Sequence, residues 1–296
     1  MPSFETPGPI TATVELDFGT ARITAGKRTD TVVEVLPSNG SDDDDVRAVR
    51  QTQVSCTDGR LSVRTPKKRS PFGTAGSIEV SIELPAGSDL RGSTGLGSFH
   101  CEGRFGEVAL TSSLGDLKVD EAAGADLRTD HGGIRLTRST GDIEVVGSGR
   151  IELGSVAGAA TVKNLNGATE VGEVTGGLTV GAANGDISIG IAHGSVGATC
   201  ANGRIEVGVA RSGVEATSSN GGIRVGEVIR GRVDLRTSVG DLDVGIHEGT
   251  AARLDLNPKY GTVRNSLDPA DGPAGSGEPV EVHARTTAGD IIIRRA

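Results

Sequence analysis

Aromatic and sulfur-containing side chains are scarce in this sequence of 296 residues. It has no Trp, one Met, one Tyr and five Phe. A globular core of this size normally uses more large side chains, so the scarcity argues against a thick globular interior. A thin core of Val, Ile, Leu and Ala, in which each layer repeats the one below, fits this composition.

Paired cysteines, long apolar runs and an excess of basic charge are lacking too. Cys56, Cys101 and Cys200 lie far apart, which excludes a disulfide framework and a paired zinc motif. No apolar run approaches the ~18 residues of a transmembrane helix, and residues 1–7 show no secretory signal. The net charge of −9, with both signs interspersed, gives no reason to expect nucleic-acid binding. We therefore expect a reduced, cytoplasmic, soluble protein without membrane insertion.

What the sequence has in abundance is glycine, with 46 residues, and part of it recurs at a constant interval. An Asn-Gly dipeptide returns every 18 residues, and a second column of glycines keeps the same step. A fixed period of this kind indicates stacked structural units. The Asn-Gly pairs are Asn166-Gly167, Asn184-Gly185, Asn202-Gly203 and Asn220-Gly221, and the second column is Gly154, Gly172, Gly190, Gly208 and Gly226.

Short strands fill the intervals between these glycines. The recurring unit is a Gly followed by two aliphatic residues at alternate positions, as in Gly203-Arg204-Ile205-Glu206-Val207, and a looser strand comes about nine residues later. Two such short strands cannot bury an apolar face alone, but stacked copies pair with their neighbours and share one core. The predicted fold class is all-β: a parallel β-solenoid (β-helix) with about 18 residues and two short strands per coil.

We expect one continuous solenoid domain over residues 1–296. It divides into irregular N-terminal coils (10–90), regular repeats (91–265), a Gly/Pro-rich loop (266–279) and C-terminal strands (280–296). Two charged excursions interrupt the first part, acidic at Ser41–Asp45 and basic at Pro66–Pro71. Both are expected to be solvated loops.

The Asn-Gly pairs have a structural and a functional interpretation. Asn and Gly tolerate the left-handed backbone of a sharp turn, and stacked Asn side chains can hydrogen-bond to one another as amide ladders do. A line of amides could instead recognise a sugar or another polar ligand. The outward charges favour a self-contained structure, because Asp186 should neighbour Arg204, and Arg224 should neighbour Asp243. We therefore favour the structural interpretation, in which the Asn-Gly pairs and the second glycine column form a turn ladder.

Candidate catalytic and metal-binding residues do not converge in this pattern. Acid–base catalysis needs two carboxyl groups close together, whereas Asp116, Asp186 and Asp241 share a column but lie several coils apart. His193 and His247 lie about three coils apart, too far to share a metal ion. The full calcium-binding nonapeptide motif is absent. We expect no catalytic, cofactor-binding or metal-binding residues and no enzymatic activity.

Several segments resemble a known family. Residues 217–225 (TSSNGGIRV) and 285–291 (RTTAGDI) look like repeat units of the bacterial putative-adhesin family of β-strand-repeat proteins, whose function is unknown. Residues 18–23 (FGTARI) and 81–87 (SIELPAG) are similar to its actinobacterial members. The resemblance covers nearly the whole chain and implies the repeat fold. It carries over no catalytic residues.

These patterns lead us to expect a non-enzymatic cytoplasmic scaffold or protein-interaction module with an unidentified protein partner. The expected contact surfaces are the loops 37–50, 64–76 and 266–279. The alternatives are an adhesin-like or glycan-binding protein, a self-assembling structural rod, and a carbohydrate-active enzyme, which would need a carboxylate cluster on one face. The sequence leaves the oligomeric state open but favours a monomer, because Arg294 and Arg295 in the last strand would discourage edge-to-edge stacking.

Overall fold

The computed structural model describes residues 2–65, 76–267 and 279–296 of the chain. They form two compact units, Met1–Ser148 (unit 1) and Gly149–Ala296 (unit 2). The expectation of one continuous domain over 1–296 stays a prediction. Pro66–Pro71, and most of the expected loops 64–76 and 266–279, lie outside the described residues.

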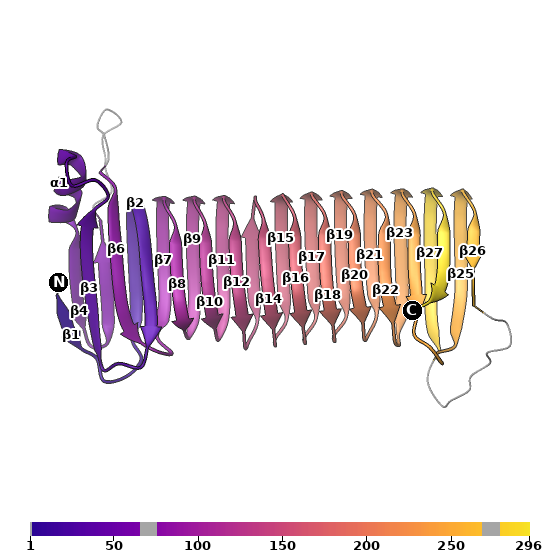
Figure 1. Cartoon of the computed structure of the whole chain (residues 1–296), viewed down its shortest axis with the longest axis horizontal. Helices are drawn as coiled ribbons and strands as arrows, with labels where there is room; N and C mark the ends of the chain where they lie inside the picture. The colour runs from indigo at the N-terminus through magenta and orange to yellow at the C-terminus, as the bar shows by residue number, and fades with distance from the viewer. Residues whose placement is uncertain (1, 66–75, 268–278) are drawn as a thin grey trace. The chain divides into compact units, whose positions relative to one another are not determined.

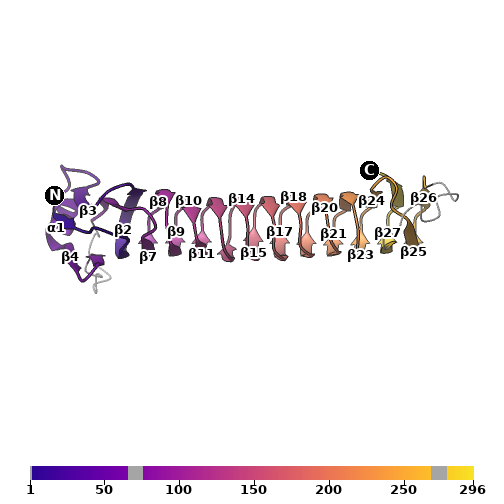
Figure 2. The same cartoon turned by 90° about the horizontal axis from the view of Figure 1, so that it is seen from below.

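Each coil contributes one strand to each of two facing layers, A and B. Figure 2 shows β8 and β10 on one side of unit 1, and β7 and β9 on the other. In the regular part of unit 2, residues 18 apart pair in parallel, as Ile187 does with Thr169 and Ile205. This register confirms the predicted all-β parallel solenoid with two strands per coil of about 18 residues.

Unit 1 contains thirteen strands and one helix among its described residues (Figure 1). In chain order they are β1 Ser3–Glu5, β2 Thr11–Gly26, β3 Asp30–Pro37, α1 Asp43–Gln51, β4 Gln53–Thr57, β5 Arg60–Arg64, β6 Ile78–Pro85, β7 Asp89–Leu96, β8 Phe99–Arg104, β9 Glu107–Leu114, β10 Leu117–Ala122, β11 Gly124–His131, β12 Ile134–Ser139 and β13 Ile143–Gly147.

Unit 2 continues with even-numbered strands in layer A and odd-numbered strands in layer B. They are β14 Ile151–Val156, β15 Ala160–Asn166, β16 Thr169–Val174, β17 Leu178–Asn184, β18 Ile187–Ala192, β19 Val196–Asn202, β20 Ile205–Ala210, β21 Val214–Asn220, β22 Ile223–Val228, β23 Arg232–Val239, β24 Leu242–Ile246, β25 Ala252–Tyr260, β26 Val263–Asn265, β27 Val280–Ala288 and β28 Ile291–Arg295.

The core of each unit is a stack of aliphatic side chains between its two layers. In β18, Ile187 and Ile189 are almost completely buried, whereas Ser188 between them is exposed. Each such side chain contributes about 1.5–3 kcal/mol through its burial. Because every coil repeats this alternation, the core needs no large aromatic side chains, as the composition indicates.

The N-terminal coils depart from chain order. Strand β2 bends at Gly19, so that its first half lies in layer B and its second half in layer A. It lies between the coil of β5 and β6 and the coil of β7 and β8. Strands β3 and β4 add antiparallel pairs outside the coil of β5 and β6. Parallel stacking in sequence order is therefore wrong for the first strands, although the prediction of irregular coils there holds.

The acidic excursion is not a solvated loop but the start of a helix. Asp42 is the N-cap of α1, and its side chain accepts a hydrogen bond from the N–H of Asp44. Asp45 is buried and accepts hydrogen bonds from the N–H groups of Asn39 (2.8 Å) and Ser77 (2.6 Å). Acidic residues in a first turn stabilise the positive end of the helix dipole. The prediction of a solvated loop at Ser41–Asp45 is therefore wrong, because these acidic residues cap and begin a helix.

The C-terminal coil of unit 2 is also out of chain order. Strand β27 pairs with β23 on one side and β25 on the other (Figure 1). Strand β28 lies in the same way between β24 and β26. The last two strands of the chain are therefore interior strands of unit 2. Arg294 and Arg295 lie in β28, so the premise that they protect a terminal edge is wrong.

Candidate functional site

The four predicted asparagines come together at one corner of unit 2, where the B-layer strands end. The Nδ2 groups of Asn184, Asn202 and Asn220 each donate to Oδ1 of the preceding asparagine at 3.0 Å. Their backbones pair in the same register. The amides therefore use their hydrogen-bonding groups on one another along the corner.

The glycine after each asparagine has a backbone that only glycine adopts readily. A Cβ on Gly185 would lie 2.2 Å from the carbonyl oxygen of Gly167, so both the turn and the close approach of coils require glycine. The φ angles are 108° at Gly167, 123° at Gly185, 150° at Gly203 and 152° at Gly221.

A buried polar side chain lies behind most of these corners. Ser218 Oγ donates to the carbonyl of Gly203 at 3.2 Å, and Thr237 Oγ1 donates to that of Gly221 at 2.9 Å. Cys200 does the same through its thiol, at 3.4 Å from the carbonyl of Gly185. These donors satisfy carbonyl groups that lie inside the corners.

Ala182 interrupts this series, and a neighbour compensates for it. Ala182 lies between Asn164 and Cys200 in the ladder and carries no donor. Asn164 Nδ2 donates to the carbonyls of Gly149 (2.9 Å) and Gly167 (3.1 Å), and thus supplies two corners. No repeat in the sequence indicates this pair of hydrogen bonds from Asn164.

The second glycine column lies in layer A and has a different cause. Pairing of β14 with β16 skips Gly154 and Gly172, so the glycines form a stacked irregularity in the strands. A Cβ on Gly190 would lie 2.4 Å from the carbonyl oxygen of Gly172. A Cβ on Gly208 or Gly226 would lie 2.6 Å from the carbonyl oxygen of the preceding glycine in the column. Close backbone approach, not a positive φ, requires these glycines.

The aspartates that could suggest catalysis hold the backbone instead. Asp116 accepts a hydrogen bond from the N–H of Gly133, Asp186 from that of Arg204, and Asp241 from that of Asp290, each at 2.8 Å. Asp290 repeats the contact with Thr262, and this bond lowers the pKa of its carboxyl group. Asp186 therefore neighbours Arg204 as expected, but through the backbone, not through the guanidinium.

The other predicted charge pair is confirmed. Arg224 pairs in register with Asp243, and their side chains approach to 3.8 Å. Both side chains are at the surface, where such pairs contribute little to stability.

Histidines and cysteines form no common centre within the described segments. His193 contacts Glu173 at 2.8 Å, and His247 contacts Glu227. Burial raises the pKa of the Cys101 and Cys200 thiols, which keeps them protonated. Over residues 2–65, 76–267 and 279–296, no three His, Cys, Asp or Glu side chains are placed to hold a metal ion. The same residues contain no helix long and apolar enough to cross a membrane.

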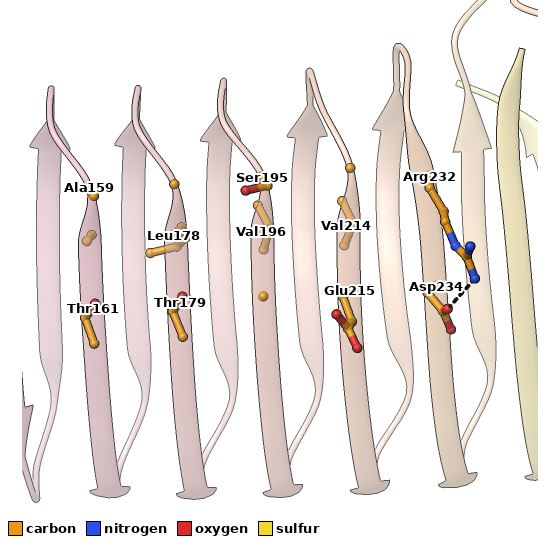
Figure 3. A pocket seen from close by; sticks show the side chains of 14 residues that line it. Ala159, Thr161, Leu178, Thr179, Ser195, Val196, Val214, Glu215, Arg232 and Asp234 are labelled. Carbon is orange, nitrogen blue, oxygen red and sulfur yellow. Dashed lines mark hydrogen bonds and ion pairs between the residues drawn. The ribbon is translucent and has the colours of Figure 1, made fainter. Parts of the chain in front are cut away.

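A hollow on the outer face of layer B in unit 2 is the best candidate for a binding site. Its volume is about 700 Å³, and it crosses the successive strands β15, β17, β19, β21 and β23 (Figure 3). Its fourteen lining residues are Ala159, Ala160, Thr161, Gly177, Leu178, Thr179, Ser195, Val196, Gly197, Gly213, Val214, Glu215, Arg232 and Asp234. We call it the B-face groove.

Small outward side chains create the B-face groove. Thr161, Thr179 and Gly197 occupy equivalent positions on adjacent strands, and the larger Glu215 and Asp234 follow them. A Cβ on Gly197 would have no atom closer than 3.9 Å. The glycine there is thus not needed by the backbone, unlike the corner glycines.

Charged groups gather at one end of the groove. Asp234 is largely buried between Arg232 (3.2 Å) and Arg236 (3.0 Å). Figure 3 shows Glu215 beside this group, on the strand before it. Glu215 is exposed and makes no ion pair or side-chain hydrogen bond with the described residues. This carboxylate is therefore available to a ligand.

The B-face groove lies outside the irregular loops at which we expect contact from the sequence. The available signal was the run of small residues at outward positions of layer B, such as Thr179 and Gly197. That signal is weak, because outward positions tolerate small residues in any β-protein. The 18-residue period already places these residues on adjacent strands, but it does not show that they line a hollow.

Comparison with known families places the chain. The model of the Toastrack DUF4097 family matches residues 13–294. The chain belongs to the Toastrack DUF4097 family. The match confirms the resemblance to β-strand-repeat proteins of unknown function. A comparison with curated proteins finds no match.

Solved structures with some likeness to this Toastrack chain have sequence identities of 11–14%. They are a putative cell adhesion protein from Clostridium sporogenes (11% identity, 100% of this chain and 98% of that chain, TM-score 0.22), a putative adhesin from Bacteroides fragilis (14%, 100% and 95%, TM-score 0.32) and a putative adhesin from Parabacteroides distasonis (11%, 100% and 95%, TM-score 0.27).

Proposed function

We propose that this Toastrack protein is a non-catalytic, cytoplasmic interaction module that binds an extended segment of a protein partner in the B-face groove. The main support for this proposal is the groove itself, with an exposed, unpaired Glu215 at one end. It crosses five strands, and at ~4.8 Å between strands this is a length of roughly 19 Å. Six extended residues at ~3.3 Å each have that length.

The chemistry of the lining favours a polypeptide over a sugar. Most of the lining side chains are small, and none of the lining residues is an aromatic platform for a sugar ring. Glu215 would pair with a Lys or Arg of the partner. Asp116, Asp186 and Asp241 hold backbone N–H groups, which supports a binding role over acid–base catalysis.

A peptide selection tests the proposal. The full chain is screened against a displayed library of random peptides, and the affinities of selected peptides are measured by fluorescence anisotropy. Gly197→Gln fills the groove without a backbone clash. We expect it to weaken peptide binding at least tenfold, and Glu215→Gln to weaken peptides that carry a basic residue. Ser188→Gln, on the exposed face of layer A, is the matched control and should change nothing.

Two results would contradict the proposal. One is selected peptides that bind the Gly197→Gln protein as tightly as the original. The other is specific binding on a glycan array that the same substitution abolishes, which would favour the adhesin-like alternative. Cell fractionation tests the cytoplasmic location separately.

A further inference from the structure

The outer coil of unit 2 leaves its core partly open. Leu254 and Leu256 of β25 occupy the inward positions that Val282 and Ala284 hold in the adjacent β27. Val282 and Ala284 are completely buried, whereas Leu254 and Leu256 keep part of their surface exposed. Val263 of β26 is 43% exposed. An apolar end of this kind is normally covered.

The two units differ in whether further elements cover an outer coil. In unit 1, antiparallel strands β3 and β4 and helix α1 follow the coil of β5 and β6. In the described part of unit 2, β25 pairs only with β27, and β26 pairs only with β28. The β25 edge therefore has the unpaired backbone groups that can accept another strand.

The direction of these groups follows from one hydrogen bond. The carbonyl of Ala251 accepts from the N–H of Val280 at 2.9 Å. In a parallel pair, alternate residues turn their N–H and C=O groups to the same neighbour. Arg253 and Asp255 therefore bond toward β27, and Ala252, Leu254 and Leu256 present their backbone groups outward.

We propose that two copies of this chain associate through β25, as an antiparallel pair centred on Leu254. In this register Leu254 lies opposite Leu254 of the second copy, and Ala252 lies opposite Leu256. All of these residues present outward N–H and C=O groups, so each pair forms two hydrogen bonds. The exposed leucines cover one another at the two-fold axis, as in a closed symmetric interface.

Charge selects this register. Arg253 then lies opposite Asp255 of the second copy, twice, in close pairs that do not share backbone hydrogen bonds. If the antiparallel pair were centred on residue 253, Arg253 would lie opposite Arg253 of the second copy. If it were centred on residue 255, Asp255 would lie opposite Asp255. A centre at Leu256 opposes Arg253 to Lys259 and Leu254 to Pro258, which has no N–H. With Leu254 at the centre, Pro258 lies beyond the paired segment.

Sedimentation equilibrium of the full chain tests the proposal. At ~100 µM we expect a dimer for the unaltered protein. Asp255→Arg and Arg253→Asp each create two like-charge contacts and should weaken the dimer about tenfold to hundredfold. An equimolar mixture of the two variants restores both opposite-charge pairs, so it should regain a dimer. Effects on contacts within one chain, such as Asp255 with His283, would not be rescued by mixing.

Lys259→Glu is the matched control, because Lys259 lies outside the paired segment, and its dimerisation should be unchanged. The proposal is overturned by a monomer at ~100 µM, by a dimer that tolerates both charge reversals, by equal weakening in the control, or by assemblies larger than a dimer. Circular dichroism melting of each variant shows whether it is folded.

Discussion

Single buried polar groups behind the corners set the local stability of unit 2. Asn164 is the clearest case, because one amide serves the carbonyls of Gly149 and Gly167. It also donates to Thr169 Oγ1 at 3.1 Å. Removing a donor from a buried carbonyl costs more than the hydrogen bond itself contributes, since the carbonyl keeps its desolvation penalty.

We expect Asn164→Ala to lower the free energy of unfolding by about 2–4 kcal/mol. Adding Ala182→Ser to it should recover about 1 kcal/mol, because a serine there can donate to Gly167 as Ser218 does to Gly203. Urea denaturation of both variants measures the difference. Equal stability of the single and double variants would show that residue 182 does not reach the corner.

At the scale of the element, the strands contain two kinds of glycine. At some positions a neighbouring coil leaves no room for a side chain, and at others there is room for one. Gly190 in β18 is forbidden a side chain by the carbonyl of Gly172. Gly181 in β17 faces open space, with no atom within 4 Å of an added Cβ. Gly190 belongs to the periodic glycine column and Gly181 does not, and the neighbouring coil explains the difference.

We expect Gly190→Ala to destabilise the protein by about 3 kcal/mol or more, because backbone atoms of the preceding coil must shift. Gly181→Ala is its matched control and should stabilise by about 0.5–1 kcal/mol, because alanine restricts the unfolded chain. Thermal unfolding followed by circular dichroism gives the sign of each change. A stabilising Gly190→Ala would refute the close approach of these coils.

On the scale of the whole molecule, the order of the strands within each unit departs from their order along the chain near its outer coils. Strand β2 lies inside unit 1, and β27 and β28 lie inside unit 2. The outer coil of unit 2 is therefore held by strands that come later in the chain. The proposed β25 dimer also belongs to this scale, because it depends on which coil is outermost.

Deleting residues 280–296 should therefore release residues 252–265, because β25 and β26 lose their neighbours β27 and β28. Hydrogen exchange measured by mass spectrometry should show lost protection in β25. Strand β19 lies between β17 and β21 and should keep its protection. Full protection of β25 after the deletion would mean that this strand pairs elsewhere.

The sequence by itself determined the coil. The 18-residue period, the Asn-Gly corners and the alternating aliphatics predict the two-strand parallel solenoid, because each depends only on local backbone geometry and on a neighbour that is a copy of itself. The same reasoning explains why Asn166 to Asn220 form a ladder and why no large aromatic residues are needed.

Only the tertiary structure decided where the repetition stops. The insertion of β27 between β23 and β25, and the antiparallel pairing of β3 with β6, depend on contacts between segments that are not copies of one another. Local patterns carry no information about such contacts. Which coil of unit 2 is outermost follows from this order of the strands.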